Sequence, residues 1–164
     1  MDRGVTPVVG VAVLLLLTVT LAASVGMVVT TATPTAPPTA HLTLAVETET
    51  QSIALTHEGG ESLDVSTLDI HVTVNDTPLT AQPPIPFFAA EGFDSGPTGP
   101  FNSRSDDEWR AGETAEFRIA GTNEPQLSAE SSVTVTVIAA ETVIFEDTVY
   151  SGTVATVVIA RGLF

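Results

Sequence analysis

The feature that most constrains this chain is an apolar run that begins almost at its first residue. From Val8 to Val29 no residue is charged, and only Thr18, Thr20 and Ser24 are polar. A helix over this run would be roughly 33 Å long at ~1.5 Å per residue, which is enough to cross the hydrocarbon core of a bilayer. The sequence therefore predicts a long hydrophobic transmembrane helix at the N-terminus.

Turn-forming and small residues mark the ends and the interior of this helix. Thr6 followed by Pro7 favours a helix start, with Thr6 as the N-cap and Pro7 at the first helical position. Residues 31–40 form a Thr/Pro-rich linker whose prolines stop a helix and favour an extended chain. Gly10 and Gly26 lie inside the run, where small residues allow neighbouring helices to approach closely.

From His41 onward the pattern changes to that of β-strands. The segment 68–74 alternates strictly between apolar and polar residues, and Asn75-Asp76 after it predicts a turn. A second turn is predicted at Gly59-Gly60. Further strand patterns occupy residues 42–58, 113–120, 131–139, 141–151 and 153–164. We therefore expect an α+β chain in which residues 41–164 form an antiparallel, β-sandwich-like head.

One segment of the head lacks a strand pattern. Residues 82–109 are rich in proline and predict a long loop, with Phe87, Phe88, Phe93 and Phe101 as apolar anchors. A loop of this length in a small domain is often functional or part of an interface. Trp109, at its end, is expected in the core.

Charge and cysteine content exclude several kinds of partner and chemistry. The formal net charge is -15, and all 5 basic residues are arginine. Nucleic acid is excluded as a partner, because binding phosphates requires clustered positive charge. An acidic surface without lysine resembles proteins of extreme halophiles, although ordinary solubilising charge is an alternative. The absence of cysteine excludes disulfides, thiol catalysis and cysteine metal sites.

No pattern in the chain indicates an enzyme, a metal or a cofactor. There is no phosphate-binding loop or nucleophile elbow, and Glu61 stands where a zinc-protease motif starting at His57-Glu58 needs a second histidine. A weak alternative is that His57, Glu58, Glu61 and His71 meet as metal ligands. We expect these instead to be solvent-facing residues beside a turn, and residues 106–108 to be a solvated acidic loop. Asn75 begins an N-glycosylation sequon, Asn75-Asp76-Thr77, and a plain turn there is equally consistent.

The first residues resemble the N-terminus of archaeal type IV pilins, particularly those of haloarchaea. That family opens with a short prepilin-type (class III) leader, then a pattern near Arg-Gly/Ala-Val-Ser/Thr-Pro-Val-Ile/Val-Gly, and then a hydrophobic helix. The matching residues here are Arg3, Gly4, Val5, Thr6, Pro7, Val8, Val9 and Gly10. The likeness strongly covers about the first 30 residues, and the segment 55–72 is similar to the first strands of haloarchaeal pilin heads.

The resemblance implies a domain organisation and a set of partners. Residues 1–4 would be a leader, with the charge of Arg3, removed after Gly4 by a prepilin peptidase so that Val5 becomes the first residue. Residues 5–30 would hold the precursor in the cell membrane with its head outside. The same helix would then join an extracellular filament through residues that include Leu14, Leu17 and Leu21. The implied partners are copies of itself or related pilins and an assembly ATPase with its platform, and the implied use is surface adhesion.

One departure and two alternatives accompany this resemblance. Bacterial type IV pilins carry a glutamate at the fifth mature position, where this chain has Val9, so assembly through that charge is not expected. One alternative is a single-pass, membrane-anchored acidic β-domain that binds a ligand and does not polymerise. The other is a secreted domain cut after the apolar run, near Ala22-Ala23-Ser24.

Overall fold

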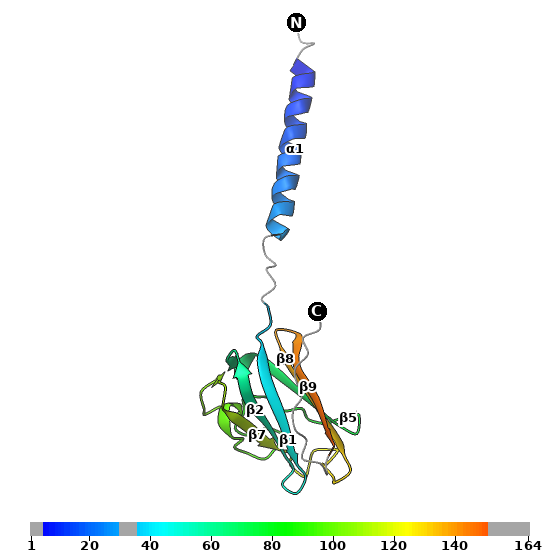
Figure 1. Ribbon diagram of the computed structural model, residues 1–164. Helices are drawn as coiled ribbons and strands as arrows, with labels where there is room; N and C mark the ends of the chain where they lie inside the picture. The colour runs from blue at the N-terminus through cyan, green and yellow to red at the C-terminus, as the bar shows by residue number, and fades with distance from the viewer. Residues whose placement is uncertain (1–4, 30–35, 151–164) are drawn as a thin grey trace. The chain divides into compact units, whose positions relative to one another are not determined.

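The structure, a computed structural model, describes residues 5–29 and 36–150, with helix side chains from residue 8 to residue 21 (Figure 1). The chain divides into two compact units, Met1–Ala36 and Pro37–Phe164. The first contains a single described helix, and the second contains antiparallel β-sheets. The expected α+β class is therefore confirmed at this level. Predictions for Arg3, Gly4 and a strand at 153–164 lie outside the described residues.

The helix α1 (Val5–Val29) begins two residues earlier than predicted, because the expected N-cap at Thr6 placed the first helical residue at Pro7. Pro7 therefore lies within the first turn, where a backbone without an N–H loses no helical hydrogen bond. The hydroxyls of Thr18 and Thr20 donate to the carbonyls of Leu15 and Leu17, each at 2.9 Å. We expected a membrane span in this helix. Among the residues that the structure describes, no helix has the length and apolarity required of one.

Within residues 37–150 the second unit contains two larger sheets and one two-stranded ribbon. In the first sheet, β2 (Ser52–Gly60) lies between β1 (Ala40–Glu47) and β7 (Thr114–Arg118). The second sheet has the order β5-β4-β8-β9, with bounds Thr77–Pro78, Leu68–Val74, Ser132–Ala139 and Thr142–Tyr150. The ribbon pairs β3 (Leu63–Asp64) with β6 (Glu108–Trp109). Short 3-10 turns occupy Val65–Thr67 and Gly99–Phe101.

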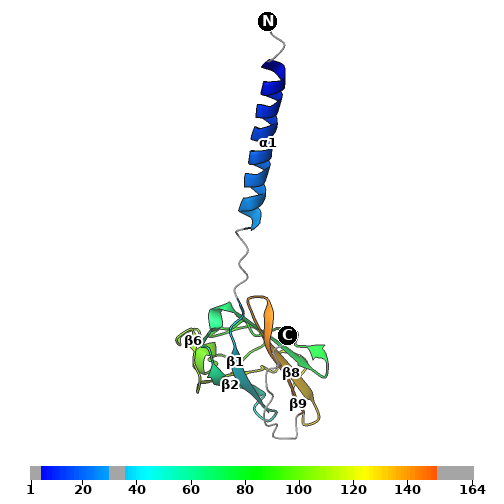
Figure 2. The same ribbon diagram turned by 45° about the horizontal axis from the view of Figure 1, so that its top comes forward.

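Alternation along the strands places the core between the two larger sheets. On β4, Leu68, Ile70, Val72 and Val74 are buried while Asp69 and His71 are exposed, as the sequence predicted. One hydrophobic cluster contains residues of both sheets. The edge strands β1 and β9 lie side by side (Figures 1 and 2). Each therefore helps to cover the other's edge, which limits unwanted strand pairing.

Aromatic rings fill the part of the core below the long loop. Trp109 has no exposed surface, and its ring lies 5.2 Å from that of Phe101 in an edge-on arrangement. Phe93 packs edge-on against Phe117 at 5.5 Å. Phe87 is also buried, so three of the four predicted loop anchors are in the core. Phe88 is the exception, because 37% of its surface is exposed.

Side-chain amides fix the long loop where strand pairing does not. Gln82 mimics a neighbouring strand by accepting from the N–H of Val72 at 2.7 Å and donating to its carbonyl at 3.0 Å. Buried Asn123 accepts from the N–H of Ala81 and donates to the carbonyls of Ala81 and Gly92. Amides suit this task because each carries both donors and an acceptor. They hold the loop in a single course without any disulfide.

The predicted turn at Gly59-Gly60 was wrong, because both residues belong to the end of β2. They pair with His41 and Ala40 just beyond a β-bulge, at which Glu58 of β2 is the extra, unpaired residue. Gly60 has a φ of +104°, a conformation that side chains disfavour. A Cβ there would lie 2.3 Å from the carbonyl oxygen of Thr39. The glycines therefore allow close approach where the chain enters the head, rather than a hairpin turn.

Gly60→Ala should destabilise the head by about 2 kcal/mol, because it combines backbone strain with a clash. Gly59→Ala is the matched control, since a Cβ at Gly59 would meet nothing within 4 Å. Its effect should stay below about 1 kcal/mol. The measurement is urea unfolding of the full chain in detergent, followed by the fluorescence of Trp109. Equal losses for the two variants would contradict this role of Gly60.

Candidate functional site

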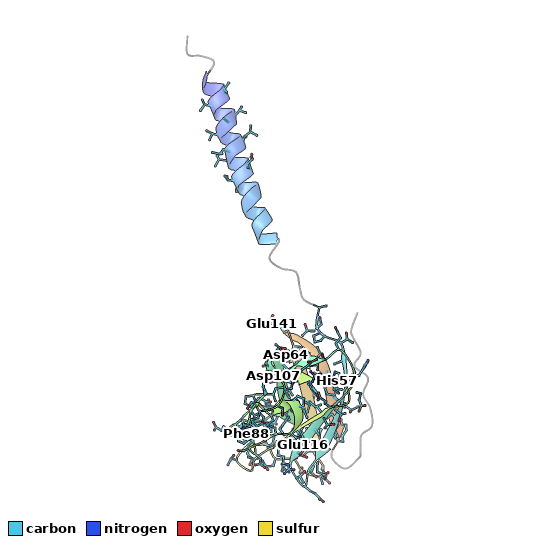
Figure 3. The ribbon with its side chains drawn as sticks, turned by 90° about the vertical axis from the view of Figure 1, so that its left-hand side faces the viewer. His57, Asp64, Phe88, Asp107, Glu116 and Glu141 are labelled. Carbon is cyan, nitrogen blue, oxygen red and sulfur yellow. The ribbon has the colours of Figure 1, made fainter. Side chains whose placement is uncertain are left out.

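The first candidate site is the surface of α1 from Val8 to Leu21, which is apolar on every side. The aliphatic side chains described between Val8 and Leu21 are exposed, from 51% at Val13 to 68% at Val8 and Leu16. Figure 3 shows these side chains projecting from both sides of the helix. The hydroxyls of Thr18 and Thr20 bond to the helix backbone and do not form a polar stripe. A helix of this composition is stable only where other apolar groups cover all of it.

The predicted assembly residues lie along this same surface. Leu14, Leu17 and Leu21 are 65%, 56% and 64% exposed. A Cβ added at Gly10 would meet nothing within 4 Å, so the backbone there is open to close approach by another helix. Val5, at which cleavage would leave the new N-terminus, is the first residue of the helix. The remaining predicted residues Thr6, Pro7, Val8, Val9 and Gly26 are also within α1.

The second feature is the junction where the chain enters the head. The N–H of Thr39 donates to the carboxylate of Glu61 at 2.9 Å, and the N–H of Glu61 donates to the carbonyl of Thr39 at 2.8 Å. This reciprocal pair lies just beyond the last ladder pair, Ala40 with Gly60. These two hydrogen bonds extend the pairing of the incoming chain with the head by one residue, to Thr39.

His57 is buried directly beneath this junction, which corrects the expectation that it faces solvent. It has no exposed surface, and its ring lies 5.8 Å from that of Trp109. Its Nε2 is 3.0 Å from the carbonyl oxygen of Glu61, so Nε2–H is the donor. Its Nδ1 is buried without a hydrogen-bond partner. The alternating pattern of β2 predicts an inward-facing side chain at this position. The prediction failed because histidine is polar and was therefore expected in solvent.

Burial lowers the pKa of His57 below its ordinary value of 6.5. The carbonyl of Glu61 and the charge of Glu113 act in the opposite direction, while His41 adds to the lowering. A proton on Nδ1 would place an unpartnered N–H and a charge in the core. The folded head therefore favours neutral His57.

The structure does not bring the possible metal ligands together. His57 is buried on β2, whereas His71 is exposed on β4 in the other large sheet. Glu58 accepts from Thr43, and Glu61 binds the incoming chain. Within the described part of the chain, no group of three or more histidine, cysteine or acidic side chains has a metal-binding arrangement.

The acidic segment 106–108 is exposed, as expected, and two of its carboxylates form ion pairs with the nearby Arg110. Arg110 contacts the carboxylate of Asp106 at 3.4 Å and also pairs with Glu108. These carboxylates raise the pKa of Arg110, with Glu108 the main cause. The backbone carbonyl of Asp107 accepts from Val65 and so holds the segment against the 3-10 turn. Figure 3 shows Asp107 near Asp64 at one end of the head.

Asn75 lies at the predicted turn and is exposed. Asn75 and Asp76 have φ values of 50° and 61°, which define a tight hairpin turn. The side-chain Oδ1 of Asn75 accepts from the N–H of Ser132 at 2.9 Å. Glycosylation would modify the side-chain nitrogen instead, and it stays a prediction.

A scan against protein-family models and a search of curated proteins returned no match for this chain.

The buried His57 predicts a stability that depends on pH. Because the pKa of His57 is lower in the folded state than in the unfolded state, its contribution to the free energy of unfolding is fully present above pH 6.5. This contribution is lost as the pH falls from 6.5 through the lower, folded-state pKa. The slope from this one group is at most about 1.4 kcal/mol per pH unit. His57→Gln should remove this component between pH 7.5 and 5, although it also lowers stability throughout. His71→Gln keeps the buried histidine and should retain the wild-type dependence in urea unfolding of the full chain. An unchanged slope in His57→Gln would contradict the assignment.

Proposed function

We propose that this protein is a filament subunit of the type IV pilin kind, exported to the cell surface and assembled through α1. The observation that carries the proposal is the exposed apolar surface of α1, which continues on every side of the helix from Val8 to Leu21. Such a helix needs apolar cover over its whole circumference. Copies of the same helix, bundled along a filament axis, supply that cover.

The order of residues at the N-terminus supports export with the helix retained. An ordinary secretory signal is cut after its apolar region, which is then lost. A cut between Gly4 and Val5 removes only the leader and leaves α1 joined to the exported head. The membrane holds the precursor until a prepilin peptidase removes the leader. It then stores the processed subunit until an assembly ATPase with its platform draws it into the filament. Head-to-tail contacts between subunits do not close, so they generate a helical filament.

Transfer of α1 from lipid to a filament is nearly neutral in apolar burial, because lipid and helix surfaces are equally apolar. Close packing at Gly10 and Gly26 and an energy-driven assembly machine therefore supply the remaining driving force. Thr18 and Thr20 do not oppose the transfer, since their hydroxyls bond within the helix. The acidic β head stays outside, where surface adhesion is its proposed use.

Two substitutions on opposite sides of α1 test whether the whole circumference is buried. Leu14 and Leu16 lie roughly 200° apart around the helix and are 65% and 68% exposed. Leu14→Asp and Leu16→Asp should each reduce filaments at least tenfold, because an aspartate within an apolar bundle loses its hydration without gaining a partner. Leu14→Met and Leu16→Met are the matched controls and should assemble normally.

The readout is the amount of sheared filament relative to processed subunit remaining in the membrane. This ratio separates failed assembly from failed export or processing. Normal assembly of both aspartate variants would contradict a bundled core. Loss in only one of them would contradict burial on every side.

A further inference from the structure

A small polar cavity opens between β7 and the segment 94–98 of the long loop. Its volume is about 300 Å³. Its polar lining comes from Asp94, Ser95, Thr98, Glu116 and Arg118, and Pro97 contributes an apolar wall. The cavity belongs to neither the surface of α1 nor the junction at Thr39.

Backbone hydrogen bonds hold the cavity open at both ends of the segment. The N–H of Asp94 donates to the carbonyl of Arg118 at 3.0 Å, and the N–H of Thr98 donates to that of Glu116 at 2.8 Å. Between these two points, Gly96 donates to the carbonyl of Phe88 at 2.7 Å. The segment therefore bows away from β7 in a fixed arc, and the space beneath the arc is built into the fold.

The strand register places this cavity at the far end of the first sheet from the chain's entry. Arg118 pairs with Ser52, whereas the chain enters where Ala40 pairs with Gly60 at the other end of β2. The separation along β2 is roughly 26 Å at ~3.3 Å per residue. Figure 3 likewise shows Phe88 and Glu116 at the end of the head away from Asp64 and Asp107.

The lining combines acceptors, donors and hydroxyls at short spacing. Arg118 contacts Glu116 at 3.4 Å, which fixes a donor beside an acceptor. Two carboxylates against one guanidinium leave a net negative lining, so an anion is disfavoured in a chain of net charge -15. Neighbouring hydroxyls of a sugar both donate and accept, and they match such a set. The volume lies at the lower limit for ligand pockets, about 300–1,000 Å³, and suits a single ring.

An aromatic residue and an arginine lie beside the cavity. The ring of Phe88 is the nearest group to a Cβ built at Gly96, at 3.9 Å. The guanidinium carbon of Arg104 lies 3.6 Å from the centroid of that ring. Among the ion pairs within residues 5–29 and 36–150, none involves Arg104. Its donors are therefore available to a ligand that extends beyond the cavity.

We propose that this cavity binds one ring of a neutral saccharide and is the adhesive site of the head. Asp94 and Glu116 accept hydrogen bonds from ring hydroxyls, and Arg118 donates to a hydroxyl or ring oxygen. Arg104 and Phe88 contact the next unit of the glycan. The adhesive role rests on the proposed function, whereas the binding chemistry rests on the cavity alone.

The test is retention of the full chain in detergent on agarose carrying glucose, galactose, mannose or N-acetylglucosamine. Retention on at least one of these sugars is expected, with elution by the free sugar. Glu116→Gln and Asp94→Asn should each reduce the retained amount at least tenfold. Glu130→Gln changes an exposed carboxylate outside the cavity in the same way and should bind like the wild type.

Three results would overturn the site. The first is no retention of the wild type on any of the four sugars, and the second is undiminished retention of both cavity variants. The third is equal retention on aminohexyl agarose, because it would show that the acidic chain binds any positively charged matrix. The cavity variants should also form filaments at the wild-type level. If neither the wild type nor any variant forms filaments, the proposed function is contradicted. The result on agarose remains valid in that case, because it depends on the cavity alone.

Discussion

Water has to be excluded from every side of α1 between Val8 and Leu21, and this requirement limits how the helix can be used. Each buried aliphatic side chain contributes about 1.5–3 kcal/mol relative to exposure, so a helix with apolar groups all around has a large penalty in water. Docking on one partner surface would cover one face of the helix and leave the other faces in water. A bundle of like helices meets the requirement, and so does lipid. Under the proposed function, the same segment serves first for storage in the membrane and then for assembly, if the leader alone is removed.

The head meets a different constraint, because it must stay soluble and ordered without disulfides. None of the acidic or arginine side chains described in the head is buried, while aromatic rings and aliphatic residues of both sheets form one core. Gln82 and Asn123 hold the long loop by satisfying backbone groups that no strand reaches. Thr39 and Glu61 secure the incoming chain at one end of the first sheet, and the proposed ligand cavity lies at the other. This arrangement separates attachment to the rest of the chain from contact with a ligand.

The sequence predicted the strands well wherever alternation was strict. The segment 68–74, its turn at Asn75-Asp76 and the strands at 132–139 and 142–150 follow from period-two patterns that one buried face enforces. Trp109 was also correctly placed in the core. Gly59 and Gly60 were misplaced because glycine signals close backbone approach as well as turns, and only the three-dimensional position of Thr39 distinguishes the two cases.

The sites were less predictable than the fold. His57 was expected in solvent because polar residues beside glycines usually are, yet its alternation with Leu55 and Ile53 already indicated an inward position. The cavity beneath segment 94–98 depends on hydrogen bonds between residues far apart in the sequence, so local patterns carry no signal for it. The apolar surface of α1, in contrast, could be predicted from the sequence, because a helix formed by a run without charges has no polar face.

The most direct test of the account is mass mapping of the N-terminus of the chain recovered from sheared surface filaments. A mature chain that begins at Val5, with the whole of α1 present, is the predicted result. A chain that begins near Ser24 or Val25 would show that the helix is discarded, and it would contradict the proposal that α1 forms the core of a filament.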